Sequence, residues 1–405
     1  MIELRGKHNN AKVFTDNIDQ NAIAQIIAML NQPYMDDSRI RIMPDVHAGV
    51  GCVIGTTMTI KDKVCPNLVG VDIGCGMETV RLREKEIDLE KLDKFINAEI
   101  PSGFDIRTIP HDFSKRIDLS KLYIAARKVS VDAPYCSIGS LGGGNHFIEV
   151  DRDDEGNLYI VVHSGSRQLG GQIAGYYQRA GARALEREAK DEAVERMKIA
   201  GQYAGIEKML KTTNFNVPKD LAYVTGSLLE QYLNDMEIAQ RFAELNRQAI
   251  IYDIVNAMDL HIEDQFTTIH NYIDLRYNIL RKGAVSAQCG EKILVPMNMR
   301  DGSLICSGLG NEDWNCSAPH GAGRVMSRGE AKERLNLEEF EEQMQGIYTT
   351  SVGRSTLDES PMVYKPMEDI LQNIQPTVSV EKIIHPIYNF KAHSQQGPIW
   401  ATQDS

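Results

Sequence analysis

One histidine of this chain stands in a segment that allows a ligand to approach closely. His320 lies in the octapeptide SAPHGAGR (317–324), where small residues surround it on both sides. A neutral imidazole that is accessible in this way can act as a nucleophile toward phosphorus. His320 is therefore the candidate catalytic residue.

Four other segments contribute side chains that bind divalent metal ions. They are Asp72 and Cys75 in VGVDIGCGM (69–77), His146 in LGGGNHFIEV (141–150), His163 in VVHSGSRQLG (161–170), and His270 in HNYID (270–274). Carboxylate, thiolate and imidazole are metal ligands, and a thiolate has enough lone pairs to bridge two cations. Two ions held beside His320 could activate a nucleotide phosphate.

Each segment taken alone also has a purely structural interpretation. Asp72 and Cys75 could be a buried carboxylate and an inert core thiol in a glycine-rich turn. The glycines before His146 could face a phosphate with their amides, or could only open a strand. His163 and His146 are 17 residues apart, which fits two adjacent strands that meet at one end. His270 by itself resembles a hydrogen-bonded core histidine.

Length and composition favour a soluble globular protein with a large core. The chain has 405 residues, of which 42% are hydrophobic and 25% are charged. The sequence shows neither a basic-then-apolar leader nor an apolar run near the roughly 20 residues that a membrane-spanning helix needs. We therefore expect a cytoplasmic location. Seven cysteines, without a C-x-x-C pair, argue against a disulfide framework.

The net charge of −12 argues against indiscriminate binding of nucleic acid. Basic residues nevertheless gather near His320. They are Arg324, Arg328, Lys332 and Arg334 after it, and Arg281 and Lys282 before it. Such a cluster is either a local basic groove or a solvated face of mixed charge.

Periodicity predicts the elements that must position these residues. An amphipathic helix is expected over residues 19–32, and strands over 53–60, 77–82, 159–162 and 292–295. Long helical patterns run through 171–211 and 227–259. Ser327 and Glu330 form a capping-box pattern that predicts a helix to about Gln345. The ligands are scattered between these elements, so we expect one α+β domain with its site at the loop ends of a sheet, and a helical segment at about 171–260.

The ordered set of motifs resembles the RtcB family of RNA-splicing ligases. PDVHAGVG (44–51), VGVDIGCGM, GGGNHFIE, HSGSR, HNY and HGAGR follow one another, and the resemblance extends from the opening residues to about Lys391. It implies a single large α+β domain over residues 1–405, with packed β-sheets surrounded by helices.

The resemblance also implies a GTP- and manganese-dependent enzyme. It would join an RNA end with a 2′,3′-cyclic phosphate or 3′-phosphate to a 5′-hydroxyl end, in RNA repair or tRNA splicing, with GMP carried on His320. Cys75 would bridge two Mn²⁺ ions, with Asp72 and His146 completing one site and His163 and His270 the other. The implied nucleotide-binding residues are Asn145, His146, Phe147, Ile148, Glu149, His270, Asn271, Pro296, Met297, Asn298, Met299, Ser303, His320, Gly321, Ala322, Gly323 and Lys391. The implied partners are broken RNA ends and GTP, with no membrane.

The chain departs from the commoner family pattern beside the nucleophile. Ala318 and Pro319 stand where many members have Cys-Ser, Gln168 replaces a usual glycine, and VPMNMRDG (295–302) replaces a Pro-Gly-Ser-Met opening. Two alternatives stay open: a metal-dependent cyclic phosphodiesterase, which would not need His320, and an RNA-end-binding protein without ligation. The sequence leaves open the physiological RNA, the use of DNA ends, the oligomeric state, an activating partner, and the metal beyond the resemblance.

Overall fold

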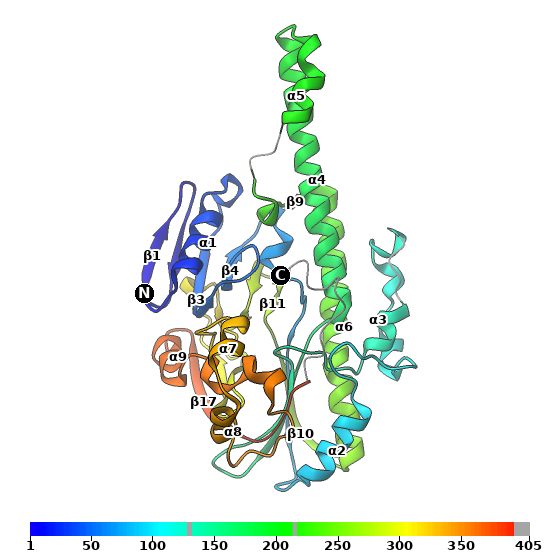
Figure 1. Cartoon of the computed structure of the whole chain (residues 1–405), viewed down its shortest axis with the longest axis vertical. Helices are drawn as coiled ribbons and strands as arrows, with labels where there is room; N and C mark the ends of the chain where they lie inside the picture. The colour runs from blue at the N-terminus through cyan, green and yellow to red at the C-terminus, as the bar shows by residue number, and fades with distance from the viewer. Residues whose placement is uncertain (128–131, 214–216, 393–405) are drawn as a thin grey trace.

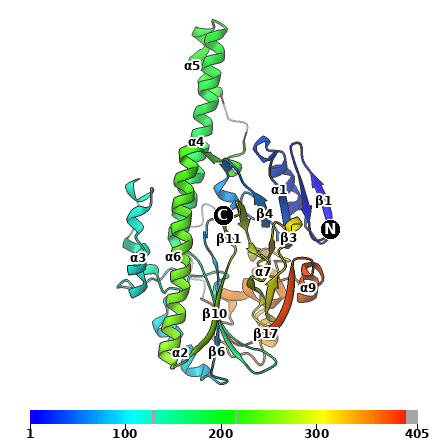
Figure 2. The same ribbon diagram turned by 180° about the vertical axis from the view of Figure 1, so that it is seen from behind.

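The structure is a computed structural model that describes residues 1–127, 132–213 and 217–392. Two large sheets lie side by side, and long helices pack along them and extend beyond them (Figures 1 and 2). The architecture is α+β, as the sequence predicts. Among the described residues, none of the helices combines the length and the apolar character needed to cross a membrane.

The first sheet has six strands. Their spatial order is β1 (Ile2–Arg5), β2 (Asn10–Val13), β3 (Ile40–His47), β4 (Ile54–Thr59), β12 (Ile279–Lys282) and β11 (Asn271–Asp274). Only the β2–β3 pair of this sheet is parallel. Two short two-stranded ladders join β13 (Ala284–Ser286) to β16 (Ser317–Pro319), and β5 (Lys63–Val64) to β9 (Val224–Thr225).

The second sheet has seven strands, all paired antiparallel. Their order is β10 (Ile262–Ile269), β6 (Gly76–Leu82), β8 (Leu158–Ser164), β7 (Phe147–Arg152), β17 (Val378–Phe390), β15 (Gly302–Gly308) and β14 (Lys292–Asn298). In an antiparallel sheet, each strand begins at the edge where its neighbours end. β6 and β7 therefore begin at the edge where β8 and β10 end, as the pairs Gly76 with Ser164 and Phe147 with His163 show.

The helices surround these sheets. They are α1 (Gln20–Leu30), α2 (Leu89–Glu99), α3 (Asp132–Ser137), α4 (Arg167–Ile199), α5 (Ile206–Thr212), α6 (Gly226–Met258), α7 (Arg328–Arg334), α8 (Leu337–Gln343) and α9 (Met367–Ile374). α4 and α6 have 33 residues each, and α4 carries α5 at the far end of an arm that projects from the body (Figure 1).

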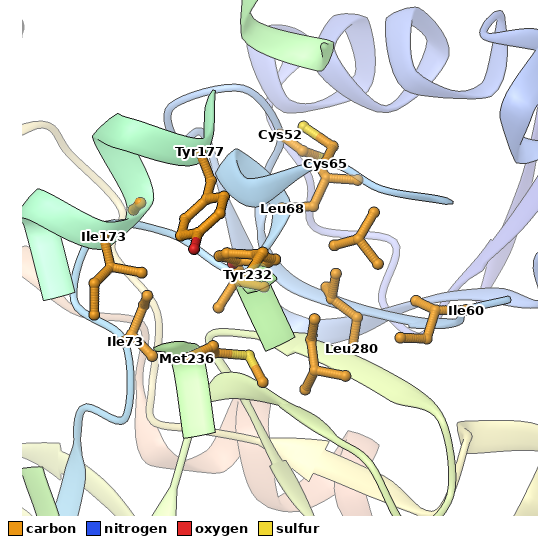
Figure 3. Packing of buried hydrophobic residues seen from close by; sticks show 14 of the residues in the cluster. Cys52, Ile60, Cys65, Leu68, Ile73, Ile173, Tyr177, Tyr232, Met236 and Leu280 are labelled. Atoms are coloured by element: carbon orange, nitrogen blue, oxygen red, sulfur yellow. The ribbon is translucent and has the colours of Figure 1, made fainter. Parts of the chain in front are cut away.

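Aromatic and sulfur-bearing side chains join the base of the arm to the first sheet. Tyr177 of α4 lies 5.2 Å from Tyr232 of α6, measured between ring centroids, and its hydroxyl donates to Asp235. The same cluster continues through Met236 to Leu280 of β12 (Figure 3). This continuous apolar packing fixes the base of α4 relative to the sheets.

Most predicted elements are present. α1 begins after Asp19, whose carboxylate accepts from the amide of Ala22, and the four predicted strands correspond to β4, β6, β8 and β14. The helix predicted to run from Ser327 to about Gln345 is wrong in its length. Ser327 does cap α7, but the backbone becomes extended at Leu335, and Asn336 caps a second helix. This break lets Leu335 pack against the cluster around Phe340, so tertiary burial overrides the helical pattern.

A buried lysine ties together loops that lie far apart in the sequence. The ammonium group of Lys282 donates to the carbonyls of Val50, Cys52 and Asn67, and burial lowers its pKa. A buried cation with all three donors satisfied stabilises these loops, because each carbonyl would otherwise be desolvated without a partner.

Lys282→Met should therefore destabilise the protein by about 3 kcal/mol or more, since it leaves three buried carbonyls without a donor. Chemical denaturation followed by circular dichroism measures this loss. Lys61→Met is the control, because Lys61 forms an exposed pair with Asp37 and should change stability by less than about 0.5 kcal/mol. Equal stability of the two variants would contradict this role of Lys282.

Candidate functional site

Four of the predicted ligands meet where strands β6, β7, β8 and β10 share an edge. Cys75 and His146 lie just before β6 and β7, His163 is the last residue but one of β8, and His270 follows β10. The sulfur of Cys75 lies 3.5 Å from Nε2 of His146 and 3.3 Å from Nε2 of His163. Nε2 of His163 lies 3.4 Å from Nε2 of His270. Segments up to about 200 residues apart in sequence thus present sulfur and nitrogen to one point.

Asp72 completes this group from the loop before Cys75. One oxygen lies 3.0 Å from Nε2 of His146, and the other accepts the amide of Ser166 at 3.2 Å. Gly165 makes room for this carboxylate, because a Cβ there would lie 2.1 Å from it. The loops before β6 and after β8 are therefore locked together by Asp72.

Backbone carbonyls determine which nitrogen of each ring faces inward. Nδ1 of His146 lies 2.9 Å from the carbonyl of Leu141, and Nδ1 of His163 lies 3.1 Å from that of Asn145. A carbonyl can only accept, so both Nδ1 atoms carry the proton and both Nε2 atoms carry a lone pair. Burial also lowers the pKa of His163 and of His270 far below the usual value, which keeps these rings neutral.

Converging lone pairs fit a cation. Cys75, His146 and His163 are buried and present ligand atoms within 4.8 Å of one another. Without a positive charge these atoms repel one another, and burial together with Asp72 raises the pKa of the Cys75 thiol. A divalent metal would reverse both effects, because it attracts the lone pairs and favours the thiolate. The donors present thus suit a metal ion that accepts nitrogen, sulfur and oxygen.

His320 lies beside this cluster and is held by Asp45. The His320 and His270 ring centroids are 4.9 Å apart. One oxygen of Asp45, which is fully buried on β3, lies 2.6 Å from Nδ1 of His320 and also accepts its backbone amide at 3.1 Å. This carboxylate holds the proton on Nδ1, so Nε2 of His320 is free to attack an electrophile.

A cavity of about 690 Å³ opens on His320 and His163. Most residues that were predicted to bind the nucleotide line it: Asn145, Phe147, Glu149, Pro296, Met297, Asn298, Met299, His320, Gly321, Ala322, Gly323 and Lys391. Its volume is in the range of small-molecule and cofactor pockets.

Five residues predicted to contact the nucleotide do not line this cavity. His146 and His270 belong to the ligand cluster behind it. Ile148 points to the opposite face of β7 from Phe147 and Glu149, because side chains alternate along a strand, and it packs in the core. Asn271 is engaged with the amide of Gly283 and the carbonyl of Asp72, and Ser303 is fully buried on β15.

Each basic residue of the cluster after His320 is paired with an acid, Lys332 with Asp358 and Arg334 with Glu330 among them. Glu359, at the end of a short 3-10 helix (Arg354–Glu359), lies 3.0 Å from Lys391 and 3.5 Å from Arg324, and also pairs with Arg328. These cations outweigh the effect of burial and lower the pKa of Glu359 to about 2. Arg281 and Lys282 are buried and do not face the cavity.

Sequence reasoning missed two acidic residues of the site. Asp45 lies in the PDVHAGVG motif (44–51), but no spacing rule links it to a histidine 275 residues away. Glu359 stands in no recognisable motif. Pro319 continues β16 up to His320 by pairing with Ala284, so the unusual Ala-Pro pair forms a strand that leads directly to the candidate nucleophile.

Comparisons with known proteins identify one family. The family described as "tRNA-splicing ligase RtcB" matches residues 25–135 and 125–392. The chain is 30% identical to the RNA-splicing ligase RtcB1 of an Escherichia coli strain, over 87% of this chain and 90% of that protein. It is 29% identical to the RNA-splicing ligase RtcB of Escherichia coli K12 over the same shares, and 26% identical to the tRNA-splicing ligase RtcB of Aeropyrum pernix over 82% and 83%.

Removal of one converging imidazole should weaken metal binding. We expect His163→Ala to lose at least about tenfold in Mn²⁺ affinity, measured by calorimetry and by metal content after gel filtration, because it deletes a donor at the centre of the cluster. Cys75→Ala should lose both ions if its sulfur bridges them, whereas His163→Ala should retain one. His261→Ala, an exposed histidine paired with Glu84, serves as the control. Wild-type metal content in Cys75→Ala would refute the bridge.

Proposed function

This chain belongs to the RtcB family of RNA-splicing ligases, and on that premise we propose that it is a GTP- and manganese-dependent RNA ligase. It joins an RNA end with a 3′-phosphate or 2′,3′-cyclic phosphate to a 5′-hydroxyl end, in RNA repair or tRNA splicing. The observation that carries the proposal is the free Nε2 of His320, which lies at the boundary between the ligand cluster and the cavity.

We assign the cluster to two Mn²⁺ ions. Cys75 would bridge them, Asp72 and His146 would hold one, and His163 and His270 the other. Bound there, the metal would withdraw charge from a phosphate and favour its attack by a nucleophile. The convergence of four donors supports this assignment, whereas the choice of manganese over zinc or iron follows from family membership alone.

In the first step, Nε2 of His320 attacks the α-phosphate of GTP. An Nε2–P bond forms, the bond to the β-phosphate oxygen breaks, and pyrophosphate leaves. The ring then carries GMP on Nε2 and a proton on Nδ1, and so bears a positive charge. The Asp45 carboxylate, 2.6 Å from Nδ1, balances that charge and holds the ring in its orientation.

In the later steps GMP passes to the RNA and then leaves. A cyclic phosphate is first opened by water to a 3′-phosphate. An oxygen of that 3′-phosphate attacks the phosphorus on His320, which breaks the N–P bond and restores the neutral ring. The 5′-hydroxyl of the second strand then attacks the activated 3′-phosphate, forms the new phosphodiester and releases GMP and a proton.

The cavity supplies the nucleotide site of this proposal. Asn145, Phe147, Glu149 and Lys391 would surround the guanosine from one side. Residues 296–299 and 321–323 would approach from the other. Residues 1–405 would act as one catalytic domain in the cytoplasm.

His320→Ala tests the ligase against the two alternatives. With labelled GTP and Mn²⁺, the wild-type protein should acquire label that acid removes and alkali does not, as a P–N bond requires, and His320→Ala should acquire none. A cyclic phosphodiesterase would keep its activity in His320→Ala, and an RNA-end-binding protein would acquire no label in either form. Label that persists in His320→Ala would place the nucleophile elsewhere.

Asp45→Asn should slow guanylylation by about 10²-fold or more, because an amide no longer balances the charge that develops on the ring. The affinity for GTP should change little, since Asp45 contacts His320 and does not line the cavity. Single-turnover labelling at varied GTP concentration separates the two quantities, and Asp37→Asn is the exposed control. A larger effect on GTP affinity than on rate would contradict the role of Asp45 in orienting His320.

A further inference from the structure

Three arginines form a row on the exposed side of helix α4. We call Arg179, Arg183 and Arg187 the arginine row, and all three are exposed. Residues four apart are neighbours on a helix surface, with Cβ atoms about 6 Å apart, so their guanidinium groups lie in sequence along one side of the arm.

No ion pair joins the arginine row to any residue that the structure describes. Three lysines of the arm, by contrast, are paired: Lys190 with Glu186 at 2.5 Å, Lys198 with Glu195 at 3.9 Å, and Lys211 with Glu207 at 3.0 Å. The positive charge of the row is therefore not compensated by a partner, in a protein whose net charge is −12.

Two glutamates near the row interact with other groups. Glu186, between Arg183 and Arg187 in sequence, is engaged by Lys190, and Lys219 adds a second positive charge near it, so that both lower its pKa. Burial raises the pKa of Tyr223, and the charge of Glu188 adds to that shift. Neither carboxylate forms an ion pair with the arginine row.

Helix α4 connects this surface to the catalytic centre. Its first residue, Arg167, donates to the carbonyl of Gly103 and to the hydroxyl of Ser140, and its guanidinium packs over Gly142 next to His146. At a rise of 1.5 Å per residue, the row lies about 18 to 30 Å along the helix axis from Arg167. Both views show α4 leaving the body of the protein and extending into solvent (Figures 1 and 2).

We propose that the arginine row binds the phosphate backbone of the RNA substrate at a distance from the ends that are joined. This inference rests on the proposed function and adds to it a site for folded or double-stranded RNA. Guanidinium groups bind phosphate through two parallel hydrogen bonds, and such contacts position an RNA without reading its sequence. The cations around Glu359, by contrast, are compensated by that carboxylate.

The test compares two RNAs that share the same reactive end. One is a hairpin whose 3′-phosphate end continues into a stem of about one helical turn, and the other is a tetranucleotide 3′-phosphate, too short to reach the row. In R179Q/R183Q/R187Q the hairpin should bind at least about tenfold more weakly at low salt. The slope of log affinity against log salt should fall by about 2 to 3, since each lost phosphate contact removes 0.7 to 0.9. Tetranucleotide binding and His320 guanylylation should match the wild type.

A matched variant removes the same charge from paired positions of the same arm. K190Q/K198Q/K211Q also loses three positive charges, and it should leave the salt slope of hairpin binding unchanged. Wild-type hairpin binding in the arginine variant, or an equal loss in the lysine variant, would overturn the inference. The inference would also be overturned if the arginine variant kept its RNA binding but lost an acidic protein partner in a pull-down. Failure of the wild type to accept GMP on His320 would instead count against the proposed function, which the salt slope does not measure.

Discussion

The site depends on where three imidazole rings place their Nδ1 protons. His146 and His163 donate them to backbone carbonyls, and His320 donates its proton to the carboxylate of Asp45. Since each acceptor lies on the outer side of its ring, each Nε2 presents a lone pair inward. Two of these lone pairs meet the sulfur of Cys75, and the third faces the cavity. The same type of hydrogen bond thus orients both the candidate metal ligands and the candidate nucleophile.

Loops that carry such groups must be rigid, and buried cations make them so. Arg247 of α6 is fully buried and donates to the carbonyls of Gly74 and Ser164, which flank the cluster. Lys365 donates to the carbonyls of Pro44 and Val46 on either side of Asp45. A buried cation that serves several carbonyls at once fixes loops for which no regular ladder supplies partners. Long helices and extended strands therefore support a site that is itself built from loops.

Charge is distributed differently in the cavity and on the arm. In the cavity, Glu359 engages Arg324, Arg328 and Lys391, so the basic residues near His320 are held in fixed positions. On α4, the arginine row has no acidic partner among the described residues, although the chain as a whole is acidic. Paired cations hold the wall of a small cavity in place, and unpaired cations on an exposed helix suit a long polyanion.

The sequence by itself determined the residue types, the α+β class and most elements, because hydrophobic periodicity and glycine turns are local properties. It also indicated the family, through the ordered motifs around Asp72, His146 and His320. Tertiary structure alone decided which side chains meet: Asp45 with His320, Glu359 with Lys391, and Ile148 with the core and not the cavity. It also decided that the helix after Ser327 breaks at Leu335. These outcomes depend on packing between segments up to hundreds of residues apart, and no local pattern records such contacts.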